Sequence, residues 1–241
     1  MWPEADATVA LVALAVLAGA VIQGVGGIGF SMFVAPLVAV ARPELVPGPM
    51  LVLGGSVSLL ALLRERRRID YRAAGIALAG RLPGTVAAGL VVGLLPPRHF
   101  SVVFAVLVLA AVALSLVARR AYGETPPRLA AAGFVSGLMG TITSVGAPPM
   151  ALVMQRSEPA RLRATMGLFL FVGAVASIAA LAWAGRFGWG DLQLSLVLLP
   201  PLAAGFWFSS AFSGRVPPRA VRLLVLGISA LSALILLAQS R

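Results

Sequence analysis

The sequence predicts an all-α, polytopic membrane protein made of two inverted repeats, each a broken-helix hairpin followed by three transmembrane helices. Composition is the first observation, because 60% of the residues are hydrophobic and only 11% are charged, whereas a soluble chain has about a quarter of its residues charged. Second, all eight carboxylates lie between the long apolar runs and none lies inside one, as expected if those runs cross hydrocarbon. Third, two of the apolar runs are interrupted by glycine and proline at corresponding places.

The first repeat, residues 1–120, opens with an interrupted apolar run over 8–41. Four glycines between Gly24 and Gly29 and then Pro36 fall inside this run, and both residue types weaken or break a helix. We therefore predict a hairpin there. Three uninterrupted apolar segments follow and are predicted to be membrane spans: 50–63, 73–95 and 100–118.

The second repeat, residues 121–241, has the same order. Its interrupted run covers 129–154 and contains glycines from Gly137 to Gly146 followed by Pro148 and Pro149. The predicted spans after it are 164–184, 192–212 and 220–238.

A fixed offset relates the two repeats. A shift of 121 residues places Asp70 on Asp191, Gly84 on Gly205, and Pro96-Pro97-Arg98 on Pro217-Pro218-Arg219. The interrupted runs need a shift of 113 instead, which places Gly24 on Gly137 and Pro36 on Pro149. The second repeat has thus gained eight residues between its interrupted run and the Asp191 loop.

The arginines predict the orientation of the spans. Fourteen of the 19 lie in four segments, 64–72, 119–128, 156–163 and 215–222, and cytoplasmic loops are enriched in basic residues. These segments share one face only if each interrupted run returns to the side from which it entered. The two halves then have opposite orientation, as in transporters with inverted repeats, and both termini are predicted to lie outside the cell.

The chemistry of the chain excludes several functions. The arginines that give the chain its net charge of +11 flank apolar spans, which favours the lipid bilayer over nucleic acid as a partner. There is no cysteine, and no serine–histidine pair, paired aspartates or metal-binding cluster lies within the spans, so we expect no cofactor, no metal and no intramembrane enzyme. No carboxylate lies in a span either, so an obvious proton relay is missing, and the sequence does not identify a coupling ion.

The two interruptions are the predicted substrate site. Where a membrane helix breaks, the helix that follows presents free N–H groups and the positive end of its dipole, which attract anions. We expect such helices to start near Ser31 and near Pro149, and paired breaks of this kind indicate the binding site of a secondary transporter. The candidate substrate-binding residues are Gln23, Gly26, Gly27, Gly29, Ser31, Arg81, Thr141, Thr143, Ser144, Gly146 and Pro149.

Arg81 is the only formal charge in the middle of a predicted span, since Arg222 is the third residue of 220–238 and lies at its edge. Intramembrane charges are functional candidates, and its repeat partner is Leu202, so the fold does not require a charge there. The alternative is that Arg81 snorkels toward the cytoplasmic face.

Other motifs have structural interpretations. Gly80/Gly84, Gly89/Gly93 and Gly133/Gly137 have the spacing of close helix packing, and the loops at Asp70 and Asp191 suggest helix caps. For Gln23, a ligand and an interhelical hydrogen-bonding group remain equal alternatives.

Taken together, four motifs resemble the sulfite exporter TauE/SafE family: Gly24–Pro36, the Arg-Arg-Ile-Asp-Tyr-Arg loop (67–72), Gly80-Arg81-Leu82-Pro83-Gly84-Thr85 and Gly137–Pro149. The resemblance covers essentially the whole chain. It implies a transporter in the prokaryotic inner membrane that moves small sulfur-containing anions, such as sulfite, sulfonates or sulfoacetate, by alternating access. The second motif departs from the family in having Ser144-Val145-Gly146-Ala147-Pro148-Pro149 where a further glycine is common. An anion channel of the same fold is the alternative.

Overall fold

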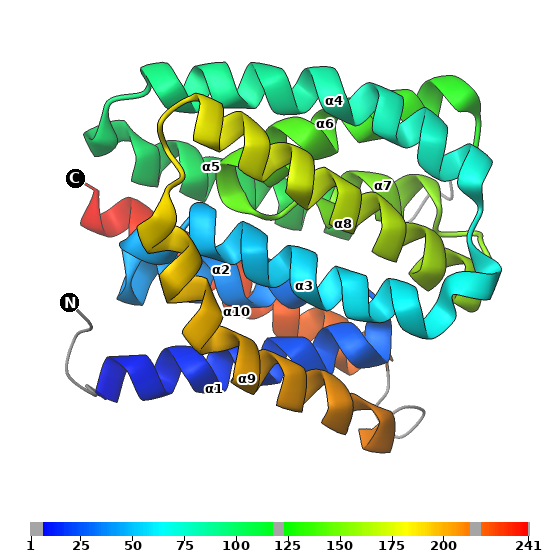
Figure 1. Ribbon diagram of the computed structural model, residues 1–241, viewed down its shortest axis with the longest axis horizontal. Helices are drawn as coiled ribbons and strands as arrows, with labels where there is room; N and C mark the ends of the chain where they lie inside the picture. The colour runs from blue at the N-terminus through cyan, green and yellow to red at the C-terminus, as the bar shows by residue number, and fades with distance from the viewer. Residues whose placement is uncertain (1–6, 118–122, 213–217, 241) are drawn as a thin grey trace.

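The structure, a computed structural model, describes residues 7–117, 123–212 and 218–240 of the 241-residue chain. These residues form ten α-helices and two short 3-10 turns and contain no strand (Figure 1). In chain order the helices are α1 (Ala7–Gly26), α2 (Phe30–Ala41), α3 (Gly48–Glu65), α4 (Tyr71–Leu94), α5 (Pro97–Val117), α6 (Pro126–Thr143), α7 (Ala147–Val153), α8 (Pro159–Trp183), α9 (Trp189–Phe212) and α10 (Pro218–Gln239). Seven of the described helices are long and apolar enough to cross a membrane, namely α1, α3, α4, α5, α8, α9 and α10. The predicted all-α membrane class is confirmed.

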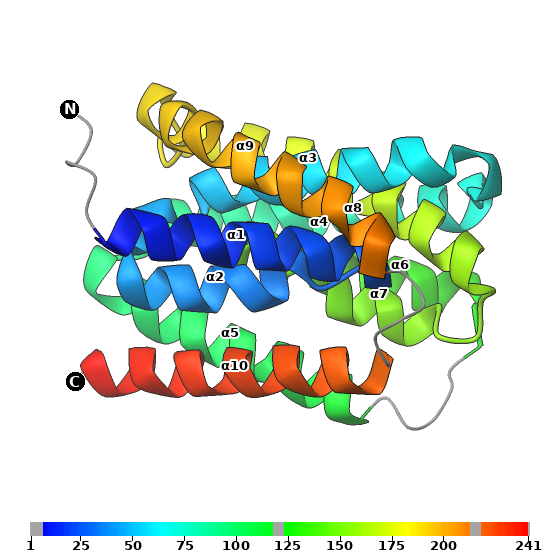
Figure 2. The same cartoon turned by 90° about the horizontal axis from the view of Figure 1, so that it is seen from below.

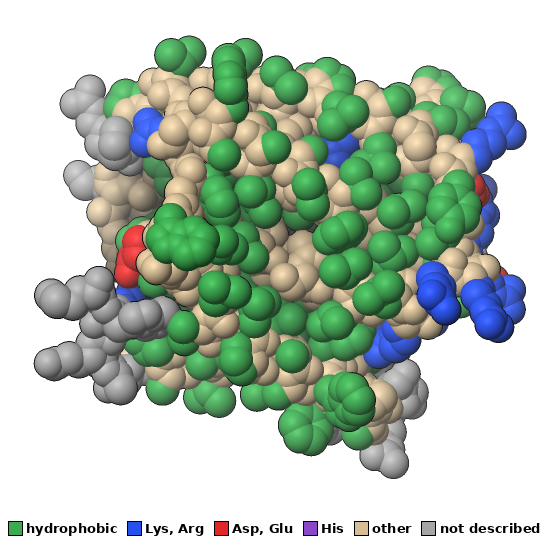
Figure 3. All heavy atoms as spheres, in the orientation of Figure 1, with side chains coloured by type: hydrophobic (Ala, Val, Ile, Leu, Met, Phe, Trp, Pro, Cys, Tyr) green, Lys and Arg blue, Asp and Glu red, His purple; other side chains and the backbone are tan. Residues whose placement is uncertain are grey.

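The helices run mostly along the longest axis of the molecule, so their ends gather at two faces. The carboxyl ends of α3, α5, α7 and α9 lie at one end, on the right in Figure 1, whereas α1 begins and α10 ends at the other (Figures 1 and 2). Arginine side chains gather at the right-hand end, and hydrophobic side chains cover the middle of the face in Figure 3. The arginine-rich segments, as far as they are described, therefore share one end of the bundle.

The first interrupted run forms two antiparallel helices, α1 and α2, that lie side by side (Figure 2). The break falls at Gly27 and Gly29, whose φ angles of 76° and 123° lie in the left-handed region that favours glycine. The 20 residues of α1 extend about 30 Å at 1.5 Å per residue, the thickness of the hydrocarbon core. The returning helix α2 has 12 residues and is much shorter.

The second interrupted run breaks later than its glycines suggest. Gly137 and Gly140 lie inside α6, and the backbone leaves the helix only at Ser144, with φ 63°, before α7 starts at Ala147. Gly137 and Gly140 are therefore helical and do not belong to the break, whereas the starts of α2 at Phe30 and of α7 at Ala147 agree with those predicted near Ser31 and Pro149. Here the glycines serve close packing, since a Cβ atom on Gly137 would lie 2.3 Å from the carbonyl oxygen of Arg81.

The closest helix packing joins the two halves of the chain. Gly80 and Gly84 on α4 face Gly133 and Gly137 on α6, and a Cβ atom on any of the four would lie 1.9–2.3 Å from a carbonyl oxygen of the opposite helix. This confirms the predicted packing role of these four glycines, because small residues let membrane helices approach. Gly89 packs more loosely, because a Cβ atom added there would lie 3.2 Å from the Cβ of Ala180 on α8.

Candidate substrate-binding site

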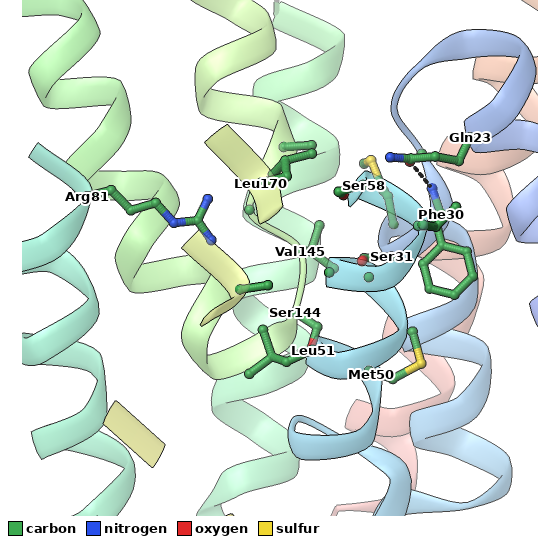
Figure 4. Close-up of a pocket in the computed structure, with 18 residues that line it drawn as sticks. Gln23, Phe30, Ser31, Met50, Leu51, Ser58, Arg81, Ser144, Val145 and Leu170 are labelled. Atoms are coloured by element: carbon green, nitrogen blue, oxygen red, sulfur yellow. Dashed lines mark hydrogen bonds between the residues drawn. The ribbon is translucent and has the colours of Figure 1, made fainter. Parts of the chain in front are cut away.

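A cavity of about 40 Å³ lies where both hairpin breaks meet α3. Six of the eleven predicted site residues line it: Gln23, Gly29, Ser31, Arg81, Ser144 and Gly146. Figure 4 shows Arg81 on one side and Gln23, Ser31 and Ser58 on the other, with the second break between them. Residues from both interrupted runs thus share one cavity, although they are more than 100 positions apart in sequence.

Gln23 organises the first break. Its side chain is 2% exposed, and its Oε1 accepts a hydrogen bond of 3.1 Å from the backbone N–H of Phe30, the first residue of α2 (Figure 4). The side chain therefore caps a helix start that lacks a neighbouring cap. Beside it, a Cβ atom on Gly54 of α3 would come within 2.9 Å of Ser31 Oγ, so Gly54 provides the space in which that hydroxyl reaches the cavity wall.

Ser136 organises the second break, and our sequence analysis missed it. Its hydroxyl donates to the carbonyl oxygen of Gly146, and the side chain is fully buried. A signal was available, because the shift of 113 residues places Gln23 on Ser136. In each hairpin the residue before the repeat-related glycine, Gly24 or Gly137, thus bonds the backbone across the break. On the far side of the second break, Ser144 Oγ donates to the carbonyl oxygen of Pro47 over 3.1 Å.

Arg81 is buried, with only 2% of its surface exposed. Its Nη1 donates to Ser136 Oγ over 3.3 Å, and its guanidinium carbon lies 4.8 Å from the centre of the Phe169 ring. The Nε atom has no hydrogen-bond partner, and no carboxylate in the described part of the chain pairs with this arginine. The snorkelling alternative is therefore wrong: the charge points into the protein and lacks a counter-charge there.

A sequence profile of the sulfite exporter TauE/SafE family matches residues 11–236, nearly the whole chain. The chain belongs to the sulfite exporter TauE/SafE family. The resemblance inferred from the four motifs is thereby confirmed. Members of this family are membrane transporters and not enzymes, so this protein is a multi-pass membrane transporter. Comparisons with curated proteins and with solved structures gave no match.

Two of the predicted glycines in this TauE/SafE transporter do not line the cavity. Gly26 is exposed, with nothing within 4 Å of its Cβ position, whereas at Gly27 that position lies 2.2 Å from Cγ of Arg163. The stem of Arg163 therefore covers the tip of the first hairpin. The expectation that the backbone at Gly27 approaches the substrate does not fit this contact.

Two predicted hydroxyls and a proline also lie outside the cavity lining. Thr141 Oγ1 pairs with Ser177 Oγ at 2.8 Å, and Thr143 Oγ1 donates to the carbonyl oxygen of Met139 at 2.7 Å. Both residues lie in α6, where their hydroxyls are satisfied within the protein. Pro149 is buried within α7, two residues beyond the start of that helix.

The two repeat-related aspartates lie outside the cavity and cap helices, as predicted. Asp70 Oδ1 accepts from the N–H of Ala73 over 2.9 Å at the start of α4, and Asp191 Oδ2 accepts from the N–H of Gly188 over 2.8 Å before α9. The bond from Ala73, with an ion pair to Arg161, lowers the pKa of Asp70 below its ordinary value. Within the described residues, no group of acidic or histidine side chains could hold a metal ion.

Proposed function

We propose that this TauE/SafE protein transports a small sulfur-containing oxyanion or organosulfonate, of the sulfite or sulfoacetate type, and that the cavity at Arg81 binds it. The observation that carries this proposal is a buried guanidinium, without a carboxylate partner in the described chain, that lines a cavity between two helix breaks. An uncompensated buried charge is costly. An oxyanion supplies the missing charge, and its oxygens match the planar fork of N–H donors on arginine.

Groups opposite Arg81 complete the proposed site. The carbonyl oxygen of Gln23 is used by Phe30, which leaves the amide NH2 group as a donor toward the cavity. The Ser31 hydroxyl is a further donor, and the first turn of α2 presents N–H groups and the positive end of the helix dipole. All of these groups favour an anion over a cation.

We further propose that residues 1–120 and 121–241 are inverted repeats that rock against one another. Helix packing supports this arrangement, because α4 packs on α6 and α8 as its counterpart α9 packs on α1 and α3. The pairs α3–α8 and α5–α10 each join a helix to its own counterpart. A pseudo-two-fold axis in the membrane plane would produce these pairings and permit alternating access. The arginine-rich end would then face the cytoplasm of a prokaryotic cell, with both termini outside.

A ligand panel tests the proposed substrate class. Sulfite, an organosulfonate and chloride are each added to the purified protein, and the thermal midpoint is measured. A ligand that binds the folded state raises its stability, so sulfite or the sulfonate should raise the midpoint and chloride should not. Equal midpoints with all three anions would contradict the proposal.

Flux in proteoliposomes separates a carrier from a channel. A carrier that works by alternating access shows saturable uptake of labelled sulfite that speeds up when unlabelled sulfite is loaded inside. Uptake that neither saturates nor responds to internal sulfite would assign the cavity to an anion channel instead.

A further inference from the structure

A second cavity lies at the arginine-rich end of the bundle. Its volume is about 280 Å³, and we call it the vestibule. Four arginines from the end of α3 and the 3-10 turn after it, Arg64, Arg66, Arg67 and Arg68, line the vestibule together with Glu65.

The vestibule carries an excess of positive charge. Its carboxylate, Glu65, is bonded to Arg163 Nε over 2.6 Å, and Arg68 lies 3.9 Å from Glu158. Arg66 and Arg67 make no ion pair with any described residue. Arginines that surround a hollow without matching carboxylates attract an anion into it.

Two consecutive residues of α1 connect the vestibule with the cavity at Arg81. Gln23 lines the inner cavity, and the carbonyl oxygen of the next residue, Gly24, accepts from Nη2 of Arg64 in the vestibule. Helix α3 lines both spaces, the inner one as far as Ser58 and the vestibule from Leu63, about 7.5 Å apart along the helix axis. The end of α1 therefore contacts the inner cavity through Gln23 and a vestibule arginine through Gly24.

Arg64 is exposed whereas Arg81 is buried, but the two guanidinium groups share two kinds of contact. The guanidinium carbon of Arg64 lies 4.7 Å from the centre of the Phe206 ring, and its Nη1 donates to Ser209 Oγ over 3.3 Å. Arg81 has a phenylalanine ring at 4.8 Å and a serine hydroxyl at 3.3 Å. Both arginines belong to the first repeat, and each guanidinium lies against an aromatic ring beside a hairpin break, Arg64 at the first break and Arg81 at the second.

We propose that the vestibule is a second oxyanion-binding site, which holds the small anion on its way between the arginine-rich end and Arg81. The proposal that an oxyanion binds here rests on the arginines that line the vestibule. The proposal that this oxyanion is the transported anion rests on the proposed function. The phosphate of an anionic lipid headgroup has the same chemistry, so the experiment must separate the two sources.

Anaerobic calorimetric titration of the purified full chain with sulfite tests this proposal. In neutral detergent the parent protein should show two classes of site, one weakened by salt because it is exposed and one resistant because it is buried. The double variant Arg66→Gln/Arg67→Gln should weaken the salt-sensitive class by about tenfold and leave the other unchanged. Neither side chain bonds the hairpin, so folding should be unaffected.

Arg156→Gln is the matched control, because it removes one exposed arginine from the same end but not from the vestibule. An equal loss in this variant, or a parent protein with a single class of site, would overturn the proposal. Arg81→Gln tests the proposed function separately, since it should remove the salt-resistant class alone. In nanodiscs, loss of the salt-sensitive class on replacing neutral lipid with phosphatidylglycerol would assign the vestibule to lipid headgroups and overturn its transit role.

Discussion

The guanidinium of Arg81 fits beside α8 only because Gly173 leaves room for it. A Cβ atom on Gly173 would lie 2.0 Å from both Nε and Cζ of Arg81, and one on Gly140 of α6 would lie 3.3 Å from Nη2. No sequence pattern singled out Gly173, because an isolated glycine in an apolar helix carries no periodic or repeat signal. The location of the charge thus depends on residues that sequence analysis alone could not connect to it.

Gly173→Ala should displace the guanidinium while keeping its charge. We expect sulfite binding to weaken by about tenfold or more, because a hydrogen bond to a charged group contributes roughly 1.5–3 kcal/mol. Calorimetry on protein that elutes as a single species checks this. Gly227→Ala is the control, since nothing lies within 4 Å of its Cβ position. Parent-like affinity in Gly173→Ala would show that the position of Arg81 does not matter for binding.

Asp70→Ala should destabilise the start of α4 in a pH-dependent way. The pKa of Asp70 is lowered in the folded protein, so the carboxylate contributes stability above about pH 4, its unfolded value, and this contribution is lost as the pH falls through the lower folded value. We expect a deficit of about 1 kcal/mol at pH 7, typical of a lost helix cap. Unfolding of parent and variant in detergent at pH 7 and pH 3 measures it. A deficit that grows on acidification would contradict this assignment.

At the scale of helices, apolar runs and glycine breaks predicted the elements well. The six uninterrupted segments coincide with α3, α4, α5, α8, α9 and α10, and the first break lies where its glycines are. The second break ends close to the start predicted near Pro149, but Gly137 and Gly140 do not end α6, because glycine weakens a helix without ending it and tight packing against α4 keeps Gly137 helical. Pattern alone does not distinguish a glycine that breaks a helix from one that lets two helices meet.

Gly80→Ala should lower stability by separating α4 from α6. Its Cβ would lie 2.0 Å from the carbonyl oxygen of Ala130, and backbone cannot yield as a side chain can, so we expect a loss of about 1–3 kcal/mol. Gly75 lies in the same helix, and nothing lies within 4 Å of its Cβ position, so Gly75→Ala should be neutral or stabilising. Thermal midpoints in detergent compare the two variants. Equal midpoints would show that the two helices are not in such close contact.

At the scale of the whole molecule, the arginine count predicted which segments share an end, and the structure places the described ones together (Figure 3). The site was predictable only in part. Repeat-related breaks and a charge in the middle of a span identified six cavity residues, whereas Thr141 and Thr143 turned out to bond within the protein. Hydroxyl orientation depends on tertiary contacts, which no sequence period encodes.

Single cysteines introduced into this naturally cysteine-free chain test the proposed orientation. Cysteine at Gly190 or Ser240 should react with an impermeant reagent added to intact cells. Cysteine at Arg67 or Arg156 should react only after permeabilisation, because the arginine-rich end is expected in the cytoplasm. Labelling of Arg67→Cys in intact cells would contradict the orientation and leave the fold unaffected.

Sulfite affinity in Arg81 variants tests the central claim most directly. Calorimetry at high ionic strength screens the exposed vestibule but not the buried guanidinium. Arg81→Gln should weaken binding by roughly ten- to a hundredfold, and Arg81→Lys should fall between it and the parent because ammonium lacks the planar fork. Arg72→Gln, exposed at the start of α4, should bind as the parent does. Parent-like affinity in a correctly folded Arg81→Gln protein would show that the anion is held elsewhere.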